Sequence, residues 1–130
     1  MPNLAQIAIA ARAHAHAPYS NFRVGAALET STGEIYTGCN VENSTYGLTI
    51  CAERVAVVKA ISEGARPASF VRIAIAADTP TLTPPCGACR QILAEFAPGA
   101  VITLVNLAGL SKSYTIADLL PESFNDSFLR

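Results

Sequence analysis

The chain lacks tryptophan, contains one methionine, and is poor in charge, since only 15% of its 130 residues are Asp, Glu, Lys or Arg. The formal net charge is −1, and the scattered lysines and arginines form no basic stripe that could follow a phosphate backbone. The apolar runs are also too short to span a bilayer. We therefore expect no nucleic acid partner and no membrane partner.

A signal peptide is also missing, because Met1-Pro2-Asn3 has no basic start followed by an apolar segment. Four cysteines in a leaderless chain point to a reducing compartment, in which thiols are kept for metal ions rather than disulfides. These observations predict a cytoplasmic protein.

The apolar share of the chain, 51%, is enough for the core of one domain over residues 1–130. No internal repeat, linker or low-complexity segment interrupts it. The low charge also fits additional burial in an oligomer.

Local patterns predict alternating helices and strands. Asn3 and Gln6 resemble a capping pair at the start of a helix, and Pro18 ends that helix. A hairpin is expected over residues 24–29 and 35–40, helices over 51–63 and 86–97, buried strands over 70–77 and 101–106, a short strand near 113–115 and a helical turn at 116–120. This order predicts an α/β protein with a mixed sheet and helices on both faces.

Two short runs carry cysteines at the expected helix starts, Cys51-Ala52-Glu53 and Cys86-Gly87-Ala88-Cys89. Free N–H groups and the positive end of the helix dipole stabilise thiolates at such positions. Three thiolates can hold Zn²⁺ and leave one tetrahedral position for water, on which Glu53 can act as a proton shuttle. The pattern therefore indicates a hydrolytic zinc site with Cys51, Cys86 and Cys89 as ligands.

Three thiolates weaken the Lewis acidity of the ion, so neighbouring cations should withdraw charge from the sulfurs. Arg54 and Arg90 lie next to these residues in the sequence and are expected to donate hydrogen bonds to sulfur.

Other interpretations of the cysteines remain open. A closed structural zinc site could use Cys39 as a fourth ligand and leave Glu53 on a solvated helix face. A redox Cys-x-x-Cys pair would leave Cys51 and Glu53 unexplained. A zinc module that binds a partner without catalysis is a third possibility. Outside these runs, His14 and His16 are expected to be surface or core histidines.

At these residues the chain resembles the cytidine deaminases of the small, homotetrameric, zinc-dependent type. The resemblance covers nearly the whole chain and is carried by Pro18-Tyr19-Ser20-Asn21-Phe22, Val24-Gly25-Ala26-Ala27, Gly38-Cys39-Asn40-Val41-Glu42-Asn43, Cys51-Ala52-Glu53-Arg54, Pro85-Cys86-Gly87-Ala88-Cys89-Arg90-Gln91 and Leu119-Leu120-Pro121. It implies a three-layer α-β-α sandwich around a five-stranded mixed sheet. It also implies deamination of cytidine and 2′-deoxycytidine to uridine and 2′-deoxyuridine plus ammonia, in pyrimidine salvage.

The resemblance also implies roles for the residues around the metal. Glu53 would carry protons to the ring nitrogen and to the departing amine, and the Ala52 amide would bind the base carbonyl. Arg54 would bridge the cysteine sulfurs. Phe22 would lie against the pyrimidine face, although on its own it would be taken for a core aromatic residue.

Further residues are expected at the sugar and at a subunit boundary. Asn40 and Glu42 resemble the sugar clamp of the family, whereas a lone Asn-x-Glu would merely end a strand and cap a turn. Phe124 and Tyr46 would reach into a neighbouring subunit's site. A related deaminase that acts on a modified or antibiotic nucleoside, or on a free base, remains an alternative.

Overall fold

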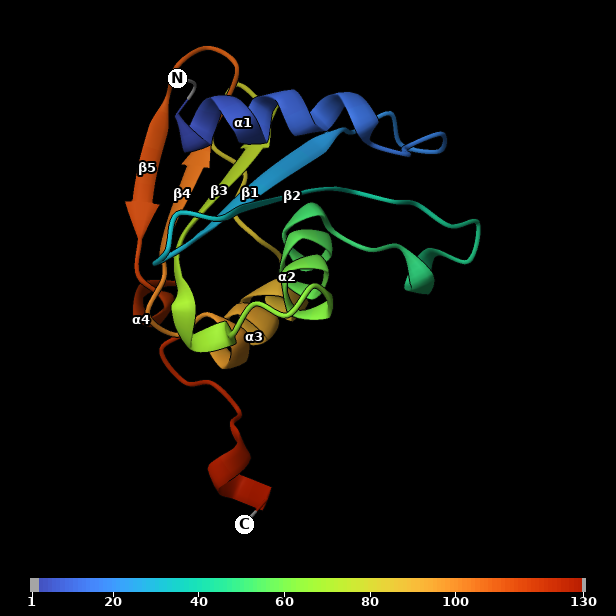
Figure 1. Ribbon diagram of the computed structural model, residues 1–130. Helices are drawn as coiled ribbons and strands as arrows, with labels where there is room; N and C mark the ends of the chain where they lie inside the picture. Colours follow the sequence, from blue (N-terminus) through green and yellow to red (C-terminus); the bar gives the residue numbers. More distant parts are fainter. Residues whose placement is uncertain (1–2, 130) are drawn as a thin grey trace.

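A mixed sheet of five strands forms the centre of the computed structural model, which describes residues 3–129 (Figure 1). The strands are β1 (Val24–Thr30), β2 (Ile35–Cys39), β3 (Phe70–Ala77), β4 (Val101–Val105) and β5 (Ser111–Tyr114). They lie in the order β2-β1-β3-β4-β5; β3 and β4 are parallel, and the other neighbours are antiparallel. The expected five-stranded mixed sheet is confirmed.

Helices cover both faces of this sheet. They are α1 (Leu4–Ala11), α2 (Ala52–Ser62), α3 (Gly87–Phe96) and the short α4 (Ile116–Leu119). Figure 1 shows α1 on one face, and α2 and α3 on the opposite face. The three-layer α-β-α sandwich is therefore confirmed.

The first helix begins as the sequence predicts but ends earlier. The Asn3 and Gln6 side chains each bond the other residue's backbone N–H, at 2.8 and 2.9 Å, which completes a capping box. The α-helical hydrogen bonding stops at Ala11, and the turn Arg12–His14 is a 3₁₀-helix. The helix therefore ends well before Pro18.

The two faces of the sheet have cores of different kinds. Beneath α2 and α3 lie large side chains, among them Leu28, Ile73 and Ile102, all fully buried. Burying each of these contributes roughly 1.5–3 kcal/mol. Beneath α1 the contacts are mainly alanines, including Ala8 and Ala27. The aliphatic core therefore lies on the α2 and α3 side.

The connections β2-α2-β3 and β3-α3-β4 place two helix starts at one edge of the sheet. Each helix precedes one of the two parallel strands, so each helix begins near the carboxyl end of the strand that follows it. Ligand sites of α/β sheets lie at this edge.

Within residues 3–129, no helix is long and apolar enough to cross a membrane.

After α4 the C-terminal segment runs away from the sheet (Figure 1) and carries the exposed side chains of Phe124 and Phe128.

Candidate metal centre and active site

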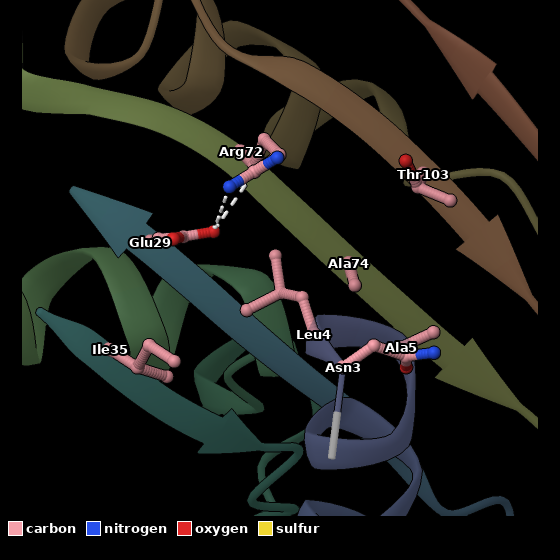
Figure 2. Close-up of a pocket in the computed structure, with 8 residues that line it drawn as sticks. All are labelled: Asn3, Leu4, Ala5, Glu29, Ile35, Arg72, Ala74 and Thr103. Carbon is pink, nitrogen blue, oxygen red and sulfur yellow. Dashed lines mark hydrogen bonds and ion pairs between the residues drawn. The ribbon is translucent and has the colours of Figure 1, made fainter. Parts of the chain in front are cut away.

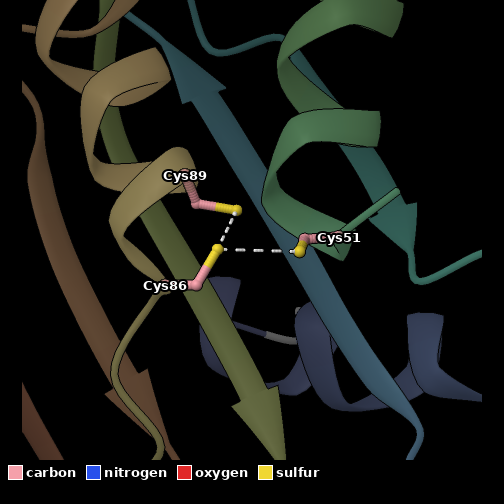
Figure 3. A group of neighbouring side chains, drawn as sticks. All are labelled: Cys51, Cys86 and Cys89. Carbon is pink, nitrogen blue, oxygen red and sulfur yellow. Dashed lines mark hydrogen bonds between the residues drawn. The ribbon is translucent and has the colours of Figure 1, made fainter. Parts of the chain in front are cut away.

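Three cysteine sulfurs meet where α2 and α3 begin. Cys51 is the N-cap residue of α2, Cys86 is the N-cap residue of α3, and Cys89 lies in the first turn of α3. The Sγ atoms of Cys51 and Cys86 are 4.0 Å apart, and those of Cys86 and Cys89 are 3.4 Å apart (Figure 3). All three sulfurs lie within 4.8 Å of one another.

This spacing fits a zinc ion. A Zn–S bond of about 2.3 Å in a tetrahedron separates neighbouring sulfurs by about 3.8 Å, between the two distances observed here. Thiolates are also the donors that zinc prefers. Among the described His, Cys, Asp and Glu side chains the cluster has three members, which leaves one tetrahedral position without a protein ligand.

Cys39 is not a member of this cluster. Its neighbour Gly38 lies directly against α2, because a Cβ at Gly38 would come within 2.4 Å of the Ala52 carbonyl oxygen. Successive residues of a strand point to opposite faces, so Cys39 points to the α1 side of the sheet. The closed-site interpretation, with Cys39 as fourth ligand, is therefore wrong.

Arg54 places a cation beside the sulfurs, as predicted. Its Nη2 donates to Cys51 Sγ at 3.6 Å and to the Thr49 carbonyl oxygen at 3.1 Å. Its Nε–H is buried and has no hydrogen-bond acceptor among the described atoms, so this donor is still available to a charged sulfur.

The prediction for Arg90 is wrong. Its guanidinium donates to two carbonyl oxygens, that of Pro85 at 2.8 Å and that of Leu119 at 2.8 Å. Arg90 therefore holds the loop before Cys86 against the end of α4. Adjacency to Cys89 in the sequence did not show this, because the partners come from distant segments.

The surroundings of the cysteine thiols shift their pKa values in opposite directions. A hydrogen bond from the Cys89 thiol, followed by the Arg54 side chain, lowers the pKa of Cys51 to about 5 against the opposing effect of burial. The same hydrogen bond with Cys51, together with burial, raises the pKa of Cys89 above the ordinary value of a thiol. The helix start and Arg54 therefore favour the thiolate form of Cys51, which is the form that binds a metal ion.

Glu53 lies in the first turn of α2 and is buried, with 4% of its surface exposed. Burial is the main cause that raises the pKa of its carboxyl, and the charge of Cys51 acts in the same direction. The neighbouring Cys89 thiol acts in the opposite direction and lowers the pKa of the carboxyl. Glu53 is therefore not on a solvated helix face, and it can hold a proton at a higher pH than an exposed glutamate.

A cavity of about 380 Å³ opens beside the sulfurs. Its polar lining includes Cys51, Cys86 and Glu53 near the helix starts, and Asn40 and Glu42 beyond the end of β2. The remaining walls are formed by Ser20, Phe22, Val24, Thr49, Ala52, Ile75, Ala77, Thr83, Pro84 and Pro85. This volume falls within the range of small-molecule sites.

A second hollow, of about 450 Å³, lies on the α1 side of the sheet (Figure 2). Its charged residues, Glu29 and Arg72, pair with each other at 2.7 Å between β1 and β3. No cysteine or histidine lines it. The smaller cavity beside the sulfurs is therefore the candidate active site.

Asn40 and Glu42 line the cavity, but the chain itself uses much of their hydrogen-bonding capacity. Asn40 Nδ2 donates to the Phe22 carbonyl oxygen at 2.7 Å, and its Oδ1 accepts from Val24 N at 2.9 Å. Glu42 accepts hydrogen bonds from the backbone of Tyr19 at 3.0 Å and from the backbone and hydroxyl of Ser20. Each side chain retains limited capacity for a ligand.

The aromatic residues named from the sequence separate into two groups. Phe22 lines the cavity and is 40% exposed. Tyr46 and Phe124 do not line it, and they are 77% and 58% exposed. Tyr46 packs edge-on against Tyr19, and Phe124 stacks on Phe128. Their expected reach into a neighbouring subunit stays a prediction.

Sequence reasoning missed Ser20 and the wall formed by Thr83 and Pro84. Ser20 lies in a motif that the sequence analysis recognised, but its hydroxyl was given no role. The position of Thr83 and Pro84 shortly before Cys86 was a usable signal, because residues that lead into a ligand usually border its site.

Comparison with known proteins decides the family. The family model described as "Cytidine and deoxycytidylate deaminase zinc-binding region" matches residues 2–105. The chain belongs to this deaminase family. The cytidine deaminase of Sporosarcina psychrophila is 52% identical over 116 residues, which cover 88% of this chain and 84% of that protein.

The same family is found among solved structures. The crystal structure of cytidine deaminase from Burkholderia pseudomallei superposes with a TM-score of 0.92 at 46% identity, covering 95% of this chain and 100% of that one. A more distant deaminase, blasticidin-S deaminase of Bacillus cereus, is 31% identical over 107 residues, 75% of this chain and 74% of that protein.

Since the matched zinc-binding region includes all three clustered cysteines, zinc is the cofactor of this site.

Proposed function

We propose that this chain catalyses the zinc-dependent hydrolytic deamination of cytidine and 2′-deoxycytidine, with uridine or 2′-deoxyuridine and ammonia as products. The observation that carries the proposal is the three-sulfur cluster with one free vertex, next to the buried Glu53 in a nucleoside-sized cavity. The sequence identity to named cytidine deaminases supports it.

When bound, the zinc ion polarises a water molecule and lowers its pKa. Glu53 would take one proton from the attacking water and deliver it to N3 of the ring. It would then move the second proton of that water, from the new hydroxyl on C4, to the amino group that leaves C4. Because burial already raises the pKa of Glu53, its carboxyl is suited to both accepting and donating. One water and one cytidine thus give one uridine and one ammonia.

The remaining contacts orient the nucleoside. Ala52 is the first residue of α2, so its N–H has no partner within the helix and is available to the base carbonyl. Phe22 provides an apolar surface for the pyrimidine ring. The unused N–H of Asn40 and the unused lone pair on Glu42 Oε2 bind sugar hydroxyls.

The charges of the cavity favour nucleosides over nucleotides. Among residues 3–129, no lysine or arginine lines it, whereas Glu42 contributes a carboxylate. The hydrogen bond from Ser20 is the main cause that keeps the pKa of Glu42 below its usual value, so the group is charged at neutral pH. A 5′-phosphate would be repelled there, so cytidine should be a much better substrate than cytidine monophosphate.

We also propose that copies of the chain associate as a homotetramer with shared active sites. Supporting features are the exposed Tyr46 and Leu48, and the C-terminal segment with exposed Phe124 and Phe128, which extends away from the sheet (Figure 1). In this arrangement Tyr46 and Phe124 contact the substrate bound to a neighbouring copy. The free thiols and the zinc site suit a cytoplasmic enzyme of pyrimidine salvage.

The test is a substrate panel with the purified, zinc-loaded protein. Loss of cytidine absorbance should be accompanied by an equal amount of ammonia, while free cytosine and cytidine monophosphate should be poor substrates. Blasticidin S and N4-substituted cytidines belong in the same panel, because a relative at 31% identity is a blasticidin-S deaminase. Absence of cytidine turnover at full zinc loading would reject the proposal.

A further inference from the structure

Ser20 connects Glu42 and Phe22, two residues that line the cavity. Its hydroxyl donates to Oε2 of Glu42 and accepts a hydrogen bond from the Phe22 backbone N–H at 3.0 Å. Its own backbone N–H donates to Oε1 of Glu42 at 3.2 Å. A single short side chain thus fixes both a carboxylate and an aromatic residue.

The Phe22 backbone is held on both sides. Its N–H donates to Ser20, and its carbonyl oxygen accepts from Asn40 Nδ2 at 2.7 Å. The preceding residue, Asn21, has a left-handed backbone with φ of 60°, which turns the chain between Ser20 and Phe22. The position of the Phe22 ring therefore depends on these bonds rather than on a regular strand or helix.

Glu42 depends on the same hydroxyl. Oε1 already accepts two backbone N–H groups, from Tyr19 and Ser20, whereas among residues 3–129 the donor to Oε2 is the hydroxyl of Ser20. Without this donor the carboxylate loses a fixed orientation, and the Phe22 N–H loses its acceptor. The Glu42 carboxylate and the Phe22 side chain would then both be held less firmly.

We propose that Ser20 is a positioning residue for the deamination reaction, because its hydroxyl couples the Glu42 carboxylate to the Phe22 backbone. It holds the sugar end and the ring end of the cavity in one geometry. This inference rests on the proposed function, since it assumes that Phe22 and Glu42 contact the nucleoside.

Steady-state kinetics of three variants test the inference. Ser20→Ala should raise KM for cytidine about tenfold, as expected for the loss of a hydrogen bond to a charged group. Its kcat should change much less, because the zinc ligands and Glu53 are untouched. Ser20→Thr keeps the hydroxyl and should restore most of the loss. Ser111→Ala, on the edge strand β5, is the matched control and should behave as the parent.

A pH series distinguishes positioning from a merely structural role. The Ser20 hydroxyl is the main cause that lowers the pKa of Glu42, so in Ser20→Ala the carboxylate should protonate at a higher pH. The rise of KM toward acid pH should then begin at a higher pH than in the parent.

Other titratable side chains near Glu42 need a control. The charge of His16 acts on Glu42, and the phenols of Tyr19 and Tyr46 line the adjoining hollow. The series is therefore repeated in a His16→Asn background, in which the displacement caused by Ser20→Ala should persist.

The outcomes separate this inference from the function. Suppose that the parent deaminates cytidine, and that Ser20→Ala has the same KM and the same rise of KM toward acid pH as the parent. The role of Ser20 is then refuted, and the proposed function stands. If Ser20→Ala loses activity but Ser20→Thr does not recover it, the hydroxyl is not the cause and the inference also fails. If the zinc-loaded parent does not turn over cytidine, both proposals fall.

Discussion

At the scale of single residues, Asn21 is the one non-glycine residue within 3–129 that has a positive φ, and it lies next to Phe22 of the cavity wall. Its φ of 60° lies in the left-handed region, and its N–H donates to the Ala17 carbonyl oxygen at 3.0 Å. Asparagine tolerates this conformation, glycine adopts it freely, and a β-branched residue is strained in it. The side chain at position 21 therefore influences where Phe22 lies.

Substitution at this position should follow backbone preference. Asn21→Gly should keep KM for cytidine close to the parent value, whereas Asn21→Val should raise KM and lower the free energy of unfolding by about 1–2 kcal/mol. Kinetics and chemical denaturation of both variants measure this. Equal behaviour of the two variants would show that the left-handed turn does not matter for the site.

The sequence alone predicted the roles of residues whose chemistry is unusual. It did not predict the contacts of residues whose partners are distant in the sequence. Three cysteines at helix starts and one adjacent glutamate are rare enough to predict the cluster. Arg90 was assigned to sulfur, but it bonds the carbonyl oxygens of Pro85 and Leu119. A serine hydroxyl such as that of Ser20 has no pattern of its own, because the fold decides its partners.

At the scale of secondary structure, the contact between β2 and α2 positions the first zinc ligand. A Cβ at Gly38 would lie 2.4 Å from the Ala52 carbonyl oxygen and 2.6 Å from Ala56 N, both of which are backbone atoms of α2. The helix can approach the strand this closely only because residue 38 has no side chain. Cys51 and Glu53 are carried by the same helix start.

Adding one methyl group at this contact should disturb both stability and the metal site. Gly38→Ala should lower the free energy of unfolding by about 1–3 kcal/mol or more, since rigid backbone must move. Zinc affinity should fall with it, because the start of α2 shifts. Denaturation and zinc titration measure the two effects.

Gly99→Ala is the control for this experiment. A Cβ at Gly99 would have no neighbour within 4 Å, and its φ lies outside the left-handed region. If both alanine variants behave alike, the close approach at Gly38 does not position the helix.

A second contact between secondary-structure elements joins the loop before Cys86 to the end of α4. Arg90 spans the Pro85 and Leu119 carbonyl oxygens, and the neighbouring Gln91 side chain bonds the backbone of Phe124. A lysine offers one compact ammonium group in place of this planar fork. Arg90 and Gln91 thus connect the loop before Cys86 with the C-terminal segment.

Arg90→Lys should therefore lower zinc affinity about tenfold or more, as is typical when the support of a metal ligand is removed. Competition with a chromophoric chelator gives the affinity. Arg66→Lys, at an exposed position before β3, serves as the matched control and should leave it unchanged. An unchanged affinity in Arg90→Lys would mean that the loop holds its shape without this contact.

Some helix boundaries can be predicted from neighbouring residues in the sequence, whereas others depend on contacts that exist only in the folded protein. The start of α1 follows from the capping box of Asn3 and Gln6, which is visible in the sequence. Cys51 and Cys86 occupy the N-cap positions of α2 and α3 without a side-chain capping bond. The end of α1 did not follow from Pro18. Its last turn lies against β1, where a Cβ at Gly25 would meet Arg12 N at 2.8 Å, and only the folded arrangement reveals such a contact.

At the scale of the whole molecule, the zinc ion should contribute to folding, because its ligands come from two helices that are distant in the sequence. Binding energy of a metal at such a site is partly folding energy. Chelation should lower Tm by about 10 °C or more, as estimated from ligand-linked stability at high affinity. Calorimetry with and without chelator measures the shift.

Two cysteine variants control this measurement. Cys86→Ser should lose the sensitivity to chelator together with the metal. Cys39→Ser should keep it, because Cys39 lies on the other face of the sheet and outside the cluster. Chelator sensitivity that survives in Cys86→Ser would place the stabilising metal elsewhere.

The most direct test of the account is to measure bound zinc and kcat together in Glu53→Gln. The substitution removes the proton carrier and none of the three sulfurs, so we expect one zinc ion per chain and a fall in kcat of about a hundredfold to ten-thousandfold. A kcat near that of the parent at full zinc occupancy would contradict the assignment of Glu53 as the group that moves protons in this site.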